Sequence, residues 1–317
     1  MPHAHERCRD HGTPWRSHLT AKTIRAHLGK GVRLPEGEWT AETFARDGRS
    51  LITTLVRLSR YVQRKAMPAI YRIAAEIFER QLDRVIDKAM TRAGTRSAKA
   101  EVSFEVGGYE ALWLQAIEEV MEEDRVSEWL QLVKPLQSVA AQAAARTGEL
   151  MNIETSAAVL GRLAAEAREV AARITNIDET TRARFSTVIR RTIADNLSMG
   201  EIAAELRSSM TEFNRPRLNT IARTETAMAW HKGSVSTMQQ STTLQTVDVV
   251  GCEARERNSP QYRGESTCNI MAVPIHDAHL LTFHPNHTGV VVPSAFRSET
   301  GNDVDLGSGL EAVRPQV

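Results

Sequence analysis

The chain has 317 residues, of which 41% are hydrophobic and 25% are charged, and 40 Lys and Arg residues nearly balance 39 Asp and Glu residues. This composition predicts a folded chain with a substantial core, organised as roughly two domains, and excludes a globally disordered protein. The formal net charge of +1 argues against nucleic-acid binding over the whole surface. It does not exclude a local basic patch that binds nucleic acid. No apolar run approaches the roughly 18 residues of a membrane helix.

Cysteine and aromatic content narrow the class further. The three cysteines, Cys8, Cys252 and Cys268, are too few for a disulfide scaffold and fit a reducing compartment. The first residues also lack the apolar segment of a secretory signal, so we expect a soluble intracellular chain without a membrane partner. Aromatic residues make up only 5% of the chain, and the remaining apolar residues are mainly small aliphatic ones. That balance favours packed helices over a β-sandwich.

The first half of the chain predicts an arm followed by helices. Residues 1–50 are expected to form an N-terminal arm, and residues 51–149 a helical region in which apolar residues recur at three- and four-residue steps from Leu51 onward. Pro68 is expected to end or kink the first helix and to sit in the first turn of the next. The pattern breaks over 93–108, where 102–106 suggests a short strand, and Pro135 interrupts the helical spacing that follows.

Residues 150–241 predict a second helical region. An Ala-rich segment at 138–146 leads into it, and small core residues are typical of closely packed helices. Asn176 or Asp178 can cap a helix whose apolar face includes Phe185, Val188 and Ile189. The run from Ser198 to Glu201 matches a capping box and predicts another helix start, with a further helix expected to begin near 215–216.

The character of the chain changes near Thr242. Residues 242–296 have β-like runs at 247–250 and 290–292 around a polar stretch, and residues 297–317 are expected to form a tail. The fold predicted for the whole chain is therefore mainly α: an elongated helical bundle with a small irregular β module near the C-terminus, stabilised by zinc if its Cys and His residues bind metal.

Four residues of this module predict a metal site. Tetrahedral zinc prefers four ligands of the Cys and His type, and the module supplies four: Cys252, Cys268, His284 and His287. The module has few apolar residues, so a metal would add the cross-link that its core lacks. The two cysteines are separated by fifteen residues, and His276 and His279 compete as imidazole ligands. Two unlinked cysteines and two polar turn histidines are the alternative interpretation.

Other clusters allow a functional and a structural interpretation. The His284–His287 run is similar to nuclease loops and leaves a metal-dependent enzyme, nuclease or toxin-like, as the alternative function. A helical stretch contains Arg223, Thr224 and Glu225. A structural ion pair is a commoner role for such a motif than catalysis. A basic cluster falls on successive helical turns and is by default a solvated face that can also touch an acidic partner or DNA; its members are Arg57, Arg60, Arg64 and Lys65.

The ordered motifs of residues 150–295 resemble the phage Mu F-like head morphogenesis, or minor capsid, family. The segments that carry the resemblance run from Ile177 to Arg182, from Ser198 to Ala203, from Ile221 to Gly233 and from His284 to Asn286. Within them, the structural motif residues are Arg223, Thr224, Glu225, His231, Gly233, Pro285 and Asn286. His231 stands where members commonly have Asn, and His287 stands where they commonly have Cys.

The resemblance implies a structural role without enzymatic activity. It implies a minor head protein of the virion, assembled in the host cytoplasm and held inside the capsid near the portal vertex. The implied partners are the portal protein and the major capsid or scaffold protein, with contact to packaged DNA. Residues 1–150 lie outside the resemblance, and their helices are a candidate for the part that contacts portal or capsid.

Overall fold

The computed structural model describes residues 37–97, 106–123, 128–159, 161–163, 176–250, 271–281, 287 and 289–298. Several predicted features lie outside these residues: the first part of the N-terminal arm, most of the short strand at 102–106, and the tail beyond 298. Of the predicted site residues, Cys252, Cys268, His284, Pro285 and Asn286 also lie outside them.

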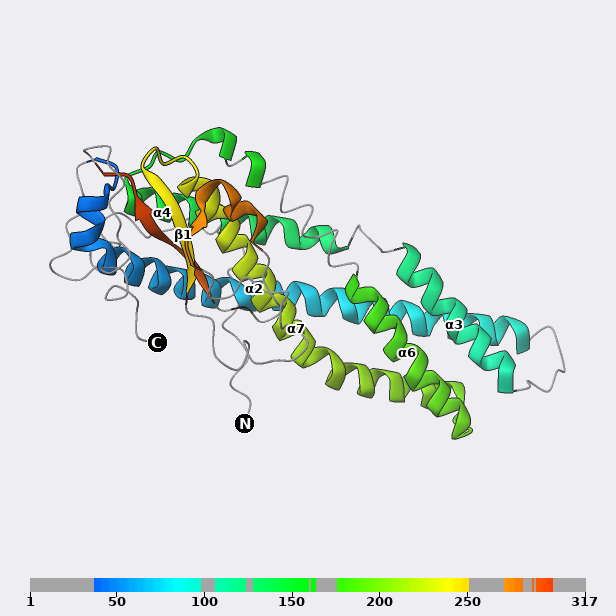
Figure 1. The fold of residues 1–317 in the computed structure, drawn as a ribbon. Coiled ribbons are helices and arrows are strands. Elements are labelled where there is room, and N and C mark those ends of the chain that lie inside the picture. The colour runs from blue at the N-terminus through cyan, green and yellow to red at the C-terminus, as the bar shows by residue number, and fades with distance from the viewer. Residues whose placement is uncertain are drawn as a thin grey trace, which may run out of the picture.

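Two long helices run through an elongated molecule (Figure 1). They are α2 (Ala41–Ser97) and α7 (Met199–Met238), and shorter helices pack along them. α4 (Val133–Met151) lies toward one end, and α3 (Val106–Glu123) and α6 (Asn176–Ala194) lie at the other. The short 3₁₀ helix η1 (Trp129–Leu132) directly precedes α4, between these two ends. With a small sheet near the C-terminus, this confirms the prediction of a mainly α fold with a small β module.

Two separate hydrophobic cores stabilise the two ends. The first joins α2 as far as Phe78, η1, α4, the second half of α7 and the sheet, with Trp39, Trp129 and Trp230 fully buried in it. The second joins the end of α2 with α3, α6 and the first half of α7, around Trp113 and Phe185. The apolar face predicted for α6 is confirmed, and the capping box at the start of α7 is formed by Ser198 and Glu201.

Both long helices contain a proline, and the prediction that a new helix begins at each of them is wrong, whereas the alternative of a kink at Pro68 stays a prediction. α2 continues through Pro68 and α7 continues through Pro216. An internal proline removes one backbone hydrogen bond and costs about 3 kcal/mol. Here buried residues continue on both sides of each proline, such as Val62 and Ile70 on α2 or Met210 and Leu218 on α7, so packing offsets that cost. Pro135 instead lies in the first turn of α4, where a missing N–H is tolerated.

A three-stranded antiparallel sheet has the order β2–β1–β3. Its strands are β1 (Leu244–Val250), β2 (Val273–Pro274) and β3 (Val290–Phe296), and the 3₁₀ helix η3 (Ile275–Leu280) follows β2. The two longer strands confirm the predicted β-like runs, while residues 273–274 add a short third strand that pairs with β1. At the end of the β1–β3 ladder Val250 faces Val290.

Residues 38–50, assigned by the sequence to the N-terminal arm, are joined to this sheet. The Trp39 indole donates a hydrogen bond to the carbonyl of Leu150 at 2.8 Å, and the Trp39 carbonyl accepts one from the Thr243 hydroxyl at 2.6 Å. Phe44, on the first turns of α2, packs on Phe296 of β3 with ring centroids 4.9 Å apart. The beginning of α2 is therefore part of the first core.

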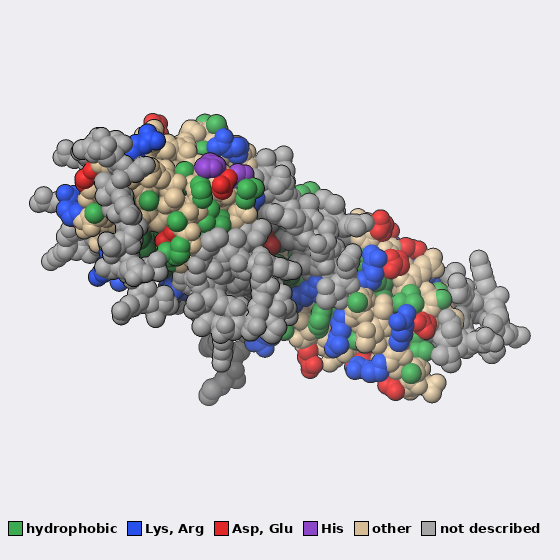
Figure 2. All heavy atoms as spheres, viewed as in Figure 1, with side chains coloured by type: hydrophobic (Ala, Val, Ile, Leu, Met, Phe, Trp, Pro, Cys, Tyr) green, Lys and Arg blue, Asp and Glu red, His purple; other side chains and the backbone are tan. Residues whose placement is uncertain are grey.

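Acidic and basic side chains alternate over the end of the molecule built from α3 and α6 (Figure 2). Many of them form ion pairs between helices, including Lys88 with Glu123 at 2.7 Å and Arg190 with Glu110 at 2.9 Å. Within the described part of the chain, no helix has the length and apolar character needed to cross a bilayer.

Candidate functional site

The second half of α7 is the most deeply packed helical segment of the first core. From Thr226 to Met238 nearly every residue is buried, because α4 lies against one face of the helix and the sheet and η3 lie against others. Gly233 makes the α4 contact possible: a Cβ built there would lie 2.0 Å from the carbonyl oxygen of Ala140 and 2.8 Å from the Cβ of Ala143. Only a residue without a side chain fits at this crossing.

Hydroxyl groups line the same crossing and satisfy one another. The Thr147 hydroxyl donates to the Ser234 hydroxyl at 3.1 Å, and the Thr237 hydroxyl donates to the carbonyl of Ala144 at 3.2 Å. Buried hydroxyls are tolerated where they have such partners. The crossing of α4 and α7 is therefore a specific, hydrogen-bonded contact.

Two histidines that are far apart in sequence meet beside this crossing. His231 lies on α7 and is 2% exposed, and His287 lies three residues before β3 and is fully buried. Their ring centroids are 5.3 Å apart, with the ring planes inclined by 54°. His231 belongs to the segment from Ile221 to Gly233 that carries the family resemblance, and His287 is the residue that directly follows the 284–286 run.

Gly289 holds His287 in place against the sheet. A Cβ at Gly289 would lie 2.8 Å from both Cε1 and Nε2 of His287, and 3.2 Å from the carbonyl oxygen of Val250. The backbone of Gly289 also lies near His231 and acts on the pKa of that imidazole. A side chain at position 289 would separate the histidine from the end of β1, so glycine is required there.

The environment keeps His231 neutral. Burial is the main cause that lowers the pKa of His231 well below its ordinary value of 6.5, and the neighbouring His287 lowers it further. The nearby backbone of Gly289 raises the pKa of His231 but does not compensate. A neutral imidazole can accept or donate a hydrogen bond, or bind a metal.

The predicted zinc site is only partly placed by the structure. Of its four residues only His287 is described, and the described residues contain no group of three or more His, Cys, Asp or Glu side chains suited to a metal. Two imidazole ligands on one tetrahedral zinc ion, each bound at about 2.0 Å, have ring centres about 5 Å apart. The 5.3 Å between His231 and His287 permits such sharing, which adds His231 to the candidate ligands.

The competing ligands and the Arg-Thr-Glu motif lie elsewhere. His276 and His279 are exposed on η3, where His276 contacts Asp277 at 3.3 Å.

The Arg-Thr-Glu motif lies on α7, where Arg223, Thr224 and Glu225 are half-buried. Among the described residues no ion pair joins Arg223 to Glu225, so the expected structural lock between them has no support here.

The site has the properties of a packing centre. Its two imidazoles are enclosed, and its hydroxyls bond to one another or to the backbone of α4. Sequence reasoning placed His231 and His287 in separate motifs. It did not predict their contact because helical spacing shows which residues share a face of α7, but not which distant segment covers that face.

Comparisons of the chain with protein-family models, curated proteins and solved structures find no match.

Proposed function

We propose that the chain is a minor head, or head morphogenesis, protein of a tailed phage, a structural component without enzymatic activity. One observation carries the proposal: His231, inside the 221–233 segment that resembles this family, packs in the core against His287, which directly follows the 284–286 run and lies 56 positions further along the chain. The enclosed character of that contact supports a structural role.

The proposed partners follow from the same resemblance. The protein would act beside the portal protein and the major capsid or scaffold protein during head assembly, inside the capsid near the portal vertex, with contact to packaged DNA. The elongated shape, with α2 and α7 reaching from one core to the other (Figure 1), suits a protein that connects two neighbours. Zinc held by Cys252, Cys268, His284 and His287 would act as a structural cross-link.

Quantitative mass spectrometry of purified heads tests this function. The expected result is a low, fixed number of copies relative to the portal protein, retained in heads that lack DNA. A chain found in the infected-cell lysate but absent from particles would contradict the proposal and favour a metal-dependent enzyme. In that case a nuclease assay on the wild type and on His284→Ala would be the next measurement.

A further inference from the structure

The middle of α2 carries an excess of positive charge. Between Asp47 and Glu76 there are six Lys and Arg side chains and no acidic residue. All six are exposed: Arg49, Arg57, Arg60, Arg64, Lys65 and Arg72. None of them forms an ion pair with a carboxylate of the described residues.

The other half of the same helix behaves differently. Arg84 pairs with Glu128 at 3.2 Å, and Lys88 pairs with Glu123 at 2.7 Å. Arg92 forms an ion pair with Glu119, whose pKa is lowered mainly by that hydrogen bond. The fold therefore neutralises the cations near α3, while those in the middle of α2 form no ion pair with a carboxylate of the described residues.

Three of these cations lie in one row. Arg57, Arg60 and Arg64 are spaced by three and four residues, and the row, here called the basic ladder, continues along the same helix face to Pro68 and Tyr71. From Arg57 to Tyr71 the helix rises about 21 Å at 1.5 Å per residue. The ladder thus leads directly to the residues around Pro68.

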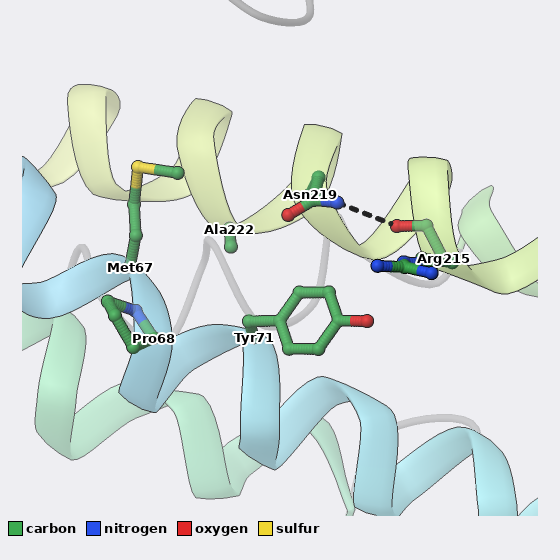
Figure 3. Close-up of a pocket in the computed structure, with 6 residues that line it drawn as sticks. All are labelled: Met67, Pro68, Tyr71, Arg215, Asn219 and Ala222. Atoms are coloured by element: carbon green, nitrogen blue, oxygen red, sulfur yellow. Dashed lines mark hydrogen bonds between the residues drawn. The ribbon is translucent and has the colours of Figure 1, made fainter.

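A cleft of about 350 Å³ lies at the end of the ladder, between α2 and α7. Its wall on α2 consists of Met67, Pro68 and Tyr71, and its wall on α7 consists of Arg215, Asn219 and Ala222 (Figure 3). The Tyr71 ring extends across the gap toward Arg215, and the Ala222 methyl group points into it (Figure 3). The cleft therefore combines an apolar floor with one cationic side.

The local sequence explains why this space is not filled. Pro68 and Ala222 are short side chains that face each other across the gap between the helices. Asn219 could reach across, but its amide nitrogen instead donates to the carbonyl of Arg215 on its own helix at 3.1 Å. An incoming side chain can occupy the space without displacing a core residue.

We propose that the basic ladder and the cleft bind an acidic helical segment of a partner protein that carries one apolar anchor residue. Carboxylates spaced by three and four residues on a helix repeat about every 5.4 Å, as the cations of the ladder do, so two such rows can pair along their length. The anchor enters the cleft, as in other helix-in-groove contacts. Nucleic acid fits less well, because a net charge of +1 gives the chain no overall attraction for a long polyanion. This inference does not depend on the proposed function.

Fluorescence anisotropy with the full chain tests the charged half of the proposal. The probe is a labelled synthetic helical peptide with Glu at every third or fourth position and one central Leu. The variant Arg57→Gln, Arg60→Gln, Arg64→Gln is expected to bind the peptide about tenfold more weakly, the loss of three exposed pairs at roughly 0.5 kcal/mol each. The matched control is Arg182→Gln, Arg190→Gln, Arg191→Gln on α6, which removes the same charge and is expected to bind as the wild type does.

A second arm tests the cleft. A peptide with Ser in place of the central Leu is expected to bind the wild type about tenfold more weakly, because one buried aliphatic side chain is lost. Asn219→Trp places an indole over the cleft from an exposed position, so this variant is expected to bind the Leu and Ser peptides equally. Circular dichroism establishes that each variant keeps its helical content.

Three results would overturn the proposal. The first is an equal loss of binding in the ladder variant and the α6 control, which would show that binding depends on net charge and not on the position of the arginines. The second is an oligonucleotide that binds more tightly than the peptide and depends on the same arginines, which would make the partner a nucleic acid. The third is peptide binding that arises only after deletion of residues 299–317, which would assign the cleft to the chain's own tail.

Discussion

Single residues decide how closely the elements of the first core can approach. Gly233 allows the backbones of α4 and α7 to touch, and Gly289 allows His287 to lie on the end of β1. In both places the important property is the missing Cβ, which a sequence shows as a plain glycine among 18. Nothing in the local pattern separates these two from glycines in open positions.

Gly233→Ala is expected to destabilise the fold by about 3 kcal/mol, because the added methyl group would overlap the carbonyl of Ala140 and force the helices apart. Gly200→Ala on the same helix is the matched control. That position is exposed and has no atom within 4 Å of a built Cβ, so the helix propensity of alanine should keep stability unchanged or raise it slightly. Urea unfolding monitored by circular dichroism measures both. Equal stability of the two variants would contradict the close contact.

The buried His231 predicts how stability depends on pH. Because its pKa is lowered in the folded state, the unfolded chain binds the proton more readily below pH 6.5. Stability is then fully present above pH 6.5 and decreases as the pH falls toward the folded pKa, by at most about 1.4 kcal/mol per pH unit for one proton.

His231→Asn removes this titration and is expected to show a shallower decrease in unfolding free energy between pH 7 and pH 5. The comparison with the wild type is made in chelator, so that loss of a bound metal does not contribute. The slopes, and not the absolute stabilities, are compared, because the smaller Asn also changes packing. Identical slopes for the two proteins would show that the proton uptake belongs to other groups.

At the scale of elements, the sequence predicts faces better than boundaries. The apolar spacing along α6 and the capping box of α7 predicted where those helices lie and which sides they bury. The prolines led to wrong helix boundaries. The sequence shows the hydrogen bond that each proline removes, but it does not show the packing against other helices that offsets this cost. Trp39 and Phe44 were likewise assigned to an arm, because their partners Leu150 and Phe296 are distant in the chain.

The C-terminal module gives a prediction that concerns metal removal. Cys252 follows β1 by two residues and His287 precedes β3 by three, so a zinc ion bound by the predicted residues would tie the ends of both strands together. Chelation is then expected to raise amide hydrogen exchange in β1, β2 and β3 while α3 and α6 keep their protection. Metal analysis of the purified chain is expected to find zinc. A metal-free chain whose exchange does not respond to chelator would contradict the site.

At the scale of the whole molecule, the two cores are the feature that the sequence did not predict. Chain order suggested helical regions at 51–149 and 150–241, but each core draws on both regions, because α2 and α7 pass through both. Periodicity identifies a buried face without naming its partner. The contact of His231 with His287, and the cleft between Tyr71 and Arg215, depend on that three-dimensional pairing and so became visible only in the fold.

The unbroken course of α2 has a mechanical consequence. With 57 residues, the helix is about 86 Å long at 1.5 Å per residue. The first core packs along it from Phe44 to Phe78 and the second from Leu82 to Ala89. A push or a twist applied to the α3–α6 end must bend this rod or reach the sheet at the other end. α2 can therefore act as a strut, and the first core supports it on both sides of Pro68, where the helix is one backbone hydrogen bond short.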